Sequence, residues 1–437
     1  KKLFLFDENY QIVFERSALV NPITDEDGFP CENLESLQQS VFDSLNEVSK
    51  LKQFSIKGIN FSAYGASFVF LGGDGKPVCP LYNYLKPYPE GLSKQFYTQY
   101  GGEEKFSLQT ASPVLGNLNS GLQLYRIKHE QPTVFKKTNY ALHLPQYLSF
   151  LLTGQYYSDL TSIGCHTAMW NFENNNYHEW LQQEGITQIL AHIEPANSTL
   201  KASFQKTNYK VGIGLHDSSS ALIHYLVNFK EPFILLSTGT WCISLNPFNQ
   251  SPLTADELKD DCLQYLQYQG KPVKASRLFS GFEHEQQVKR ISEYFKNDTT
   301  QFRNLAFNPE INNYLKSNIN QELNFAKRDL SGFRNAIEAY HQLIRDLVRL
   351  QIKSTLLVIN NSPVVKRVFV DGGFSKNSIF MTLLAASLPN MEVFAASMAQ
   401  ASAVGAALII HQEWNSKPIP NDIIQLKYYS ASQDASI

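Results

Sequence analysis

The stretch that decides the fold runs from residue 211 to residue 246 and reads VGIGLHDSSSALIHYLVNFKEPFILLSTGTWCISLN. Its first part, Val211 to Leu215, is a short run of apolar residues and glycines, which predicts a buried strand that ends at His216 and Asp217. Apolar side chains then recur at helical spacing, which predicts a helix through Ala221, Leu222, Tyr225, Leu226 and Phe229. Asp217 is therefore expected where a strand ends and a helix begins.

Two interpretations of Asp217 remain open at this point. Aspartate is a preferred N-cap, because its carboxylate accepts from backbone N–H groups that the first turn of a helix leaves without partners. A carboxylate at the carboxyl end of a strand also lies where open α/β sheets bind their ligands, which would make Asp217 a catalytic group.

A glycine-bearing turn follows in the same stretch. Residues 233–236 and 241–245 predict two strands, and Ser237-Thr238-Gly239-Thr240 predicts the turn between them. Such a turn offers backbone N–H groups and hydroxyls to an anion, and Gly239 lets the backbone approach a phosphate closely. The same residues are also ordinary in a hairpin, so the turn alone does not decide between the two.

A third element lies far downstream. Residues 368–370 predict a strand, Asp371-Gly372-Gly373 follows, and an apolar helix continues through Ile379, Leu383, Leu384 and Leu388. A nucleotide can lie against the bare backbone of such a turn. A tight strand-to-helix connection is the alternative.

In this order and spacing, the three elements resemble the FGGY family of carbohydrate kinases, which belongs to the actin-like ATPase superfamily. The resemblance extends over nearly the whole chain. Its parts are a catalytic-aspartate segment, a second phosphate loop, an adenosine motif, a closing glycine-alanine helix and a stretch in the first half: 216–221, 237–241, 371–377, 400–408 and 144–160.

The resemblance implies an α/β fold of two actin-like ATPase (ribonuclease H-like) domains with a cleft between them. Residues 1–229 would form the N-terminal domain, which binds the sugar and carries the catalytic aspartate. Residues 230–437 would form the C-terminal, nucleotide-binding domain, and we place the boundary at the polar break Lys230-Glu231-Pro232. The hairpin and strand-helix pattern of each half suggests a duplication.

The resemblance also implies ATP-dependent phosphorylation of a ketose hydroxyl, with ATP and Mg²⁺ as cofactors. Asp217 would accept the proton of the attacking hydroxyl, while Ser67, Tyr84, His216 and Asp217 would bind the sugar. Thr238, Gly239 and Thr240 would donate to the phosphates, and Gly372, Gly373 and Asn377 would hold the adenosine. No residue is assigned as a protein ligand of a metal.

The sugar is less well defined than the reaction. His216-Asp217 and Gly239-Thr240-Trp241 resemble the L-rhamnulose and L-fuculose kinases, which favours a 6-deoxy-ketohexose. However, Ser67 stands where those kinases usually carry an acid, and residues 80–87 lack their acid and arginine. The alternatives are a kinase for xylulose, ribulose or another polyol, a non-catalytic regulator that binds nucleotide or sugar, and a sugar-binding protein with no nucleotide site.

The beginning of the chain carries a further expectation. Lys1 to Glu15 reads as a strand, a turn and a strand, and its first strand, residues 2–6, corresponds to residues 241–245, the second strand of the later hairpin. The family's first strand and phosphate loop, with an aspartate that serves Mg-nucleotide, would then precede Lys1 and are absent from this chain. We expect that these residues precede the given sequence, because losing an inner strand would open a buried sheet edge.

Composition excludes several classes of protein. The 437 residues are 43% hydrophobic and 18% charged, which fits a globular chain of two or more domains. A net charge of -2 without a basic tract argues against nucleic acid or an anionic membrane as a partner. The five scattered cysteines predict a reducing compartment, and the cytoplasm is the expected location. A homodimer is left open.

Overall fold

The computed structural model describes residues 1–203, 208–319, 322, 324–360, 364–397, 400–430 and 435. The second half of the chain is built on one seven-stranded sheet, whereas the first half contains several short sheets. Within the described residues, no helix combines the length and apolar character needed to cross a bilayer.

The seven-stranded sheet is mixed, and all of its strands follow residue 230. Its spatial order is β18 (Cys262–Leu266), β19 (Pro272–Leu278), β17 (Cys242–Asn246), β16 (Phe233–Thr238), β20 (Arg367–Gly372), β21 (Glu392–Ser397) and β22 (Gln425–Tyr429). β16, β20 and β21 are mutually parallel, and the other pairs are antiparallel. Thr238 and Gly372 are register partners and the last residues of their strands. The two predicted glycine turns therefore lie side by side, at the carboxyl ends of two central strands of the sheet.

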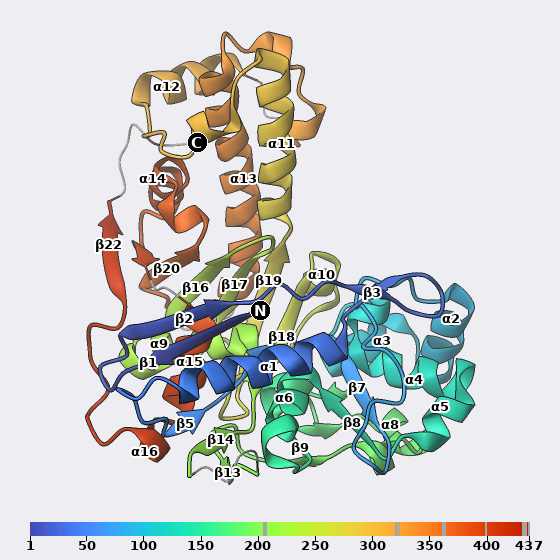
Figure 1. Ribbon diagram of the computed structural model, residues 1–437. Helices are drawn as coiled ribbons and strands as arrows, with labels where there is room; N and C mark the ends of the chain where they lie inside the picture. Colours follow the sequence, from blue (N-terminus) through green and yellow to red (C-terminus); the bar gives the residue numbers. More distant parts are fainter. Residues whose placement is uncertain are drawn as a thin grey trace.

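Helices cover both faces of this sheet. On one face lie α11 (Ser280–Phe295), α13 (Ala336–Ile359) and α14 (Ser378–Ser387), with α12 (Pro309–Asn318) beyond them (Figure 1). The predicted long helix over 331–357 is confirmed as α13, whose start is fixed by the Asn335 side chain accepting from the Glu338 amide at 3.0 Å. The other face packs on α9 (Asp217–Asn228) through a cluster that includes Leu222, Tyr225 and Phe369.

The first half begins with an antiparallel hairpin of β1 (Lys2–Phe6) and β2 (Ile12–Ser17), followed by α1 (Leu34–Ser49). Its remaining helices are α2 (Glu90–Gln99), α3 (Glu103–Thr110), α4 (Ser120–Glu130), α5 (Pro132–Lys137), α6 (Leu144–Thr153), α7 (Leu160–Ile163) and α8 (Trp180–Gln183). Short strands that matter for the site are β5 (Gly58–Ile59), β6 (Ser62–Ala63), β7 (Phe68–Leu71), β8 (Tyr140–His143), β14 (Lys210–Gly212) and β15 (Leu215–His216). A buried aromatic core around Phe96 and Trp180 holds this half together.

Two local predictions for the first half need correction. The hairpin expected over residues 67–78 forms only near its turn, where the Gly72 amide donates to the Lys76 carbonyl and the Val78 amide to the Phe70 carbonyl, each at 2.9 Å. The returning segment is not a strand of its own, and β7 pairs along its length with β8. The strand expected from Val211 to Leu215 is interrupted at Gly214, which adopts a φ of 86°. A Cβ on Gly214 would lie 2.5 Å from the carbonyl oxygen of Pro145, so the chain turns where only glycine fits.

Several contacts join the two halves, and two of them lie close to the candidate site. Helix α9 crosses α15 (Ala401–Ile409) so closely that a Cβ on Gly405 would lie 1.9 Å from the Ser220 carbonyl oxygen (Figure 1). This crossing confirms the predicted glycine-alanine helix. The edge strand β18 also contacts α7, since the Leu266 amide donates to the Gly164 carbonyl at 2.8 Å.

Candidate active site

Asp217 is the first residue of α9, and His216 precedes the helix as its N-cap. The Asp217 carboxylate accepts from the amide of the adjacent Ser218 at 2.6 Å. A capping side chain would instead accept from the amide of the second or third residue after it. The interpretation of Asp217 as the N-cap is therefore wrong. Its side chain is 47% exposed, so the carboxylate can meet a ligand.

The buried side chain of His216 contacts the carboxylate of Asp217. Its Nε2 lies 3.3 Å from Asp217 Oδ1, and its ring is only 3% exposed. Burial lowers the pKa of His216, although the nearby charges of Asp217 and Asp159 act in the opposite direction. A neutral imidazole at neutral pH can donate one hydrogen bond to the carboxylate without cancelling its charge.

Asp159 positions this segment from a distance. It is fully buried, and its carboxylate accepts from the Thr161 hydroxyl and from two amides at the start of α7, each at 2.9 Å. Burial raises the pKa of Asp159. The same Thr161 hydroxyl accepts from the His216 amide at 2.9 Å, so Asp159 fixes the end of β15 through one intermediate side chain.

The turn between β16 and β17 exposes Gly239 and Thr240. Its shape is set by two hydrogen bonds: the Gly239 amide donates to the Trp241 carbonyl at 2.9 Å, and the Phe282 amide donates to the Thr240 carbonyl at 3.1 Å. Gly281, at the start of α11, packs against the turn so tightly that a Cβ there would lie 1.8 Å from the Gly239 carbonyl oxygen. Our sequence reasoning missed Gly281, although a glycine in the first turn of a helix that follows a strand was a signal.

The second turn, after β20, is joined to the first through Thr238. Gly372 has a φ of 89°, and a Cβ there would lie 1.9 Å from the Thr238 carbonyl oxygen. The Gly373 amide donates to that same oxygen at 2.9 Å. Around Gly373 itself an added Cβ would meet no atom within 4 Å, so a flat ligand has room beside its backbone.

The contacts of Thr238 correct the prediction that its side chain donates to a phosphate. The residue is 5% exposed, and its hydroxyl donates to the Asp371 carbonyl while accepting from the Phe374 amide at 3.0 Å. A hydroxyl has one proton to donate, and here that proton is used within the protein. The Thr238 side chain therefore clamps the two turns together and does not donate to a phosphate.

Asn377 begins α14 as its N-cap. Its side-chain oxygen accepts from the Phe380 amide at 3.0 Å, and its Nδ2 donates to the Tyr340 hydroxyl at 2.8 Å. The same hydroxyl lies 3.1 Å from His284 Nε2, so α11, α13 and α14 meet in one network. One amide hydrogen of Asn377 is left over, and its contact with adenosine stays a prediction.

Tyr84 and Ser67 were both predicted to bind the sugar, and the structure places them differently. Tyr84 is half-buried, and its ring contacts Tyr64 edge to face with centroids 5.5 Å apart. Tyr64 was missed by our reasoning. It follows β6, which pairs with β15 at Ala63 and His216, so the two tyrosines lie on the His216 side of the first half.

Ser67 is a wrong prediction. It is fully buried, and its hydroxyl donates to the Tyr82 carbonyl at 2.8 Å. A side chain in that position does not reach a ligand. Ser67 instead holds the segment that carries Tyr84.

The residues fit the cofactors that the fold implies. Exposed Gly239 and Thr240, with the open backbone at Gly373, suit a nucleotide that lies along the edge of the sheet. Among the described residues, no group of three or more His, Cys, Asp or Glu side chains forms a metal site by itself. Mg²⁺ commonly binds through one or two carboxylates together with substrate phosphates, and the half-exposed Asp217 can supply one of them.

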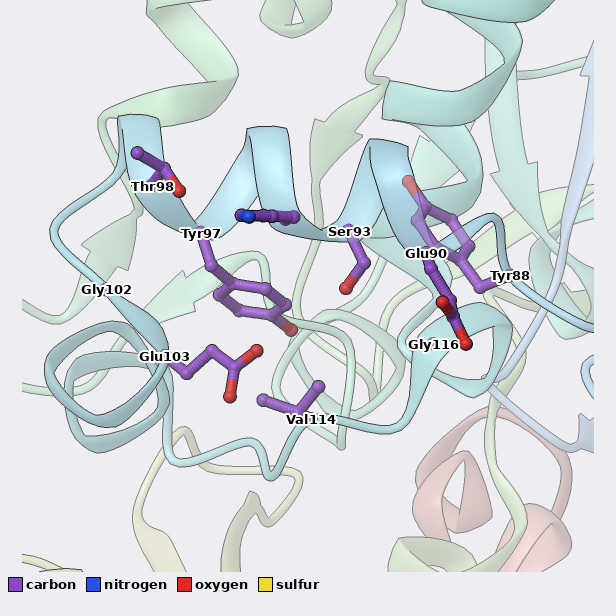
Figure 2. Close-up of a pocket in the computed structure, with 10 residues that line it drawn as sticks. Tyr88, Glu90, Ser93, Tyr97, Thr98, Gly102, Glu103, Val114 and Gly116 are labelled. Carbon is purple, nitrogen blue, oxygen red and sulfur yellow. The ribbon is translucent and has the colours of Figure 1, made fainter.

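A separate pocket of about 640 Å³ lies on the first half, between α2, the start of α3 and residues 114–116. Figure 2 shows the side chains of Tyr97 and Glu103 turned toward one another within it. Lys94 and Glu90 also line it. None of the predicted site residues lines this pocket, so it lies apart from the candidate site.

Comparisons with known proteins identify the family and the fold of the chain. The profile of the FGGY family of carbohydrate kinases, N-terminal domain, matches residues 1–223. A rhamnulokinase of Halalkalibacterium halodurans is 24% identical over 241 residues, which is 51% of this chain and 48% of that protein. A rhamnulokinase of Bacteroides thetaiotaomicron is 25% identical over 219 residues, 48% of this chain and 44% of that protein. The chain thus spans about half the length of the curated relatives it matches.

Solved structures resemble nearly the whole chain. A carbohydrate kinase from Novosphingobium aromaticivorans has a TM-score of 0.78 at 21% identity, covering 98% of this chain and 94% of that one. A ligand-bound xylulose kinase from Lactobacillus acidophilus has a TM-score of 0.78 at 16% identity, covering 99% and 92%. These likenesses confirm the predicted two-domain actin-like ATPase fold. From the family match over more than half of its length, the chain belongs to the FGGY family of carbohydrate kinases.

Proposed function

We propose that this protein transfers the γ-phosphoryl group of ATP to a hydroxyl of a ketose, with Asp217 as the general base. The observation that carries the proposal is the half-exposed carboxylate at the start of α9, held by a buried neutral histidine. The exposed glycine turns at the edge of the neighbouring sheet supply a place for the nucleotide.

In this reaction the acceptor hydroxyl attacks the γ-phosphorus, and its proton passes to Asp217. Gly239 and Thr240 hold the phosphates, while Gly372, Gly373 and Asn377 hold the adenosine. When bound, Mg²⁺ neutralises charge on the phosphate oxygens. His216 fixes the orientation of the carboxylate, which matters more than its strength as a base when the transition state is loose.

We propose the same division of labour that the family suggests. Residues 1–229 bind the sugar and carry Asp217, and residues 230–437 bind the nucleotide. This division is supported by the seven-stranded sheet, whose strands all lie between residues 233 and 429.

For the acceptor, we favour a 6-deoxy-ketohexose, L-rhamnulose or L-fuculose. The support is the name of the curated relatives, which are rhamnulokinases at 21–25% identity. A pentulose is the second candidate, because xylulose kinases from several bacteria share the fold at 13–16% identity.

The test follows ADP release with Mg-ATP and L-rhamnulose, L-fuculose, L-xylulose, D-xylulose or D-ribulose. Asp217→Asn should lower sugar-dependent turnover by about 10²–10⁴-fold, while sugar binding changes little. Asp256→Asn is the matched control, because Asp256 also lies in the first turn of a helix, α10 (Ala255–Lys259), and is 94% exposed. If Asp217→Asn turns over as fast as Asp256→Asn, the assignment of the base fails.

A further inference from the structure

Arg277 lies near the predicted reaction centre and has no role in the function described so far. It is the penultimate residue of β19 and pairs with Ile243, next to the turn that carries Gly239 and Thr240. Side chains alternate along a strand, so Arg277 shares a face with Ala275, which packs in the cluster that includes Leu222 of α9. Arg277 therefore points from the sheet toward the side on which α9 and Asp217 lie.

The guanidinium of Arg277 is held in place. Its Nη2 donates to Asp261 Oδ1 at 2.6 Å, and its central carbon lies 5.1 Å from the centroid of the Trp241 ring. Trp241 directly follows the phosphate turn. The side chain is only 6% exposed, so an ion pair on one edge and an aromatic ring on one face fix its plane.

The guanidinium also keeps unused hydrogen-bonding capacity. Its Nε is buried and has no partner among the described residues. Buried polar atoms are nearly always hydrogen-bonded, so an orphaned donor of a charged group in this position calls for a ligand or an ordered water.

A second buried group without partners lies on the side of the first half. His166 is 8% exposed, and neither of its ring nitrogens has a partner among the described residues. Burial and then the charge of Arg277 lower the pKa of His166 well below its usual range. Its ring centroid lies 6.2 Å from that of His216 and 6.1 Å from that of Tyr265.

Tyr265 lies beside His216, with ring centroids 5.5 Å apart. Burial raises the pKa of Tyr265, the charge of Arg277 lowers it, and the charge of Asp217 raises it. Both charges therefore act on this side chain.

We propose that Arg277 is a further catalytic residue that donates hydrogen bonds to the phosphoryl group during its transfer between the phosphate turn and Asp217. This inference rests on the proposed kinase function. The bond from the γ-phosphorus to the ADP oxygen breaks while the bond to the sugar oxygen forms, and the sugar proton passes to Asp217. Negative charge on the transferred group lies between donor and acceptor, where a fixed guanidinium stabilises it.

The experiment compares Arg277→Gln with Arg277→Lys and with Arg367→Gln. Arg367 is a matched control, because it also pairs with carboxylates in the same sheet but lies at the far end of β20. We expect Arg277→Gln to lower kcat by about 10²–10³-fold with KM for ATP and ketose nearly unchanged. Arg277→Lys should retain part of the activity, and Arg367→Gln should keep full activity.

Two readouts separate chemistry from folding. Added guanidinium ion should restore part of the turnover of Arg277→Ala, which a structural role would not allow. ADP with aluminium fluoride and the ketose imitates the transferred group, and Arg277→Gln should bind this mixture more weakly while binding ADP normally. The melting temperature should change little, because the Asp261 left behind is 34% exposed and can be solvated.

The outcomes are distinct. Arg277→Gln with near-normal kcat and normal aluminium fluoride binding would overturn the inference, as would a lost kcat accompanied by a collapsed melting temperature and no guanidinium rescue. If the wild-type protein phosphorylates no ketose, the proposed function fails. The titration with ADP and aluminium fluoride then decides the role of Arg277 alone: equal affinity in wild type and Arg277→Gln, or no binding by either, overturns it.

Discussion

The glycine turns that follow β16 and β20 and the wall of side chains around His216 are the two parts of the proposed site, but they are built differently. The turns are defined by backbone contacts, with Gly372 and Gly281 pressed against the carbonyl oxygens of Thr238 and Gly239. The wall is defined by side chains that come from distant parts of the chain, among them Tyr64, His166, Tyr265 and Arg277. Substitutions in the turns should therefore lower the stability of the fold, and substitutions in the wall should weaken the binding of the substrate.

The largest effect is expected at Gly372. Gly372→Ala places a methyl group against the Thr238 carbonyl at a φ of 89°, and should cost roughly 2–5 kcal/mol of unfolding free energy. Gly373→Ala is the adjacent control, since its backbone is helical and its Cβ is free of contacts. Thermal melts should separate the two, whereas ATP titration should show weaker binding in both. Equal melting temperatures would mean that the turn is not held as tightly as described.

The wall is tested by Tyr84. Tyr84→Ala removes an aromatic surface and its contact with Tyr64, so the KM for the ketose should rise roughly tenfold with little change in the KM for ATP. Ser67→Ala, which removes a hydrogen bond to the Tyr82 carbonyl in the segment that carries Tyr84, should cost about 1 kcal/mol of stability and leave both KM values almost unchanged. If Ser67→Ala raises the KM for the ketose more than Tyr84→Ala does, the roles assigned to these two residues are wrong.

A smaller effect is expected where the turns are supported from behind. Tyr340→Phe deprives Asn377 and His284 of a shared partner and should cost about 1–3 kcal/mol. Because Asn377 begins α14 beside the second turn, ATP affinity should fall several-fold while the KM for the ketose is unaffected. A variant that loses ketose affinity instead would show that the network supports the wall.

The smallest expected effect is a change of stability with pH. Burial raises the pKa of Asp371 to about 6 from an ordinary value of 3.8. Between these two values the unfolded chain releases this proton while the folded protein keeps it, so stability falls as pH rises from about 4 to 6. Asp371→Asn should remove that part of the slope, and melting temperatures of both proteins across this range give the difference. Parallel curves would contradict the assignment.

Much of the fold could be predicted because its signals are local. Glycines in turns mark backbone that a side chain would block, and Gly372 confirms this reasoning, whereas a Cβ on Gly239 would meet only the Trp241 carbonyl oxygen, at 3.7 Å. The spacing of apolar residues predicted α9 and α13 to within a few residues.

The wall could not be predicted in the same way. All four residues of β7 are buried, so alternation along the strand gives no indication of which way the neighbouring Ser67 points. Arg277 and His166 lie more than 100 residues apart, and only the packing of β18 and β19 against the first half brings them together. Thr238 likewise lies in a plausible phosphate turn, yet its hydroxyl is used by residues 371 and 374.

The central claim is phosphoryl transfer to a ketose with Asp217 as the base. Its most direct test uses ATP labelled on the γ-phosphate and follows the label with each ketose in turn. We expect a labelled sugar phosphate, formed about 10²–10⁴-fold more slowly by Asp217→Asn. Label that appears only as inorganic phosphate, or equal transfer by the Asp217→Asn variant, would contradict it.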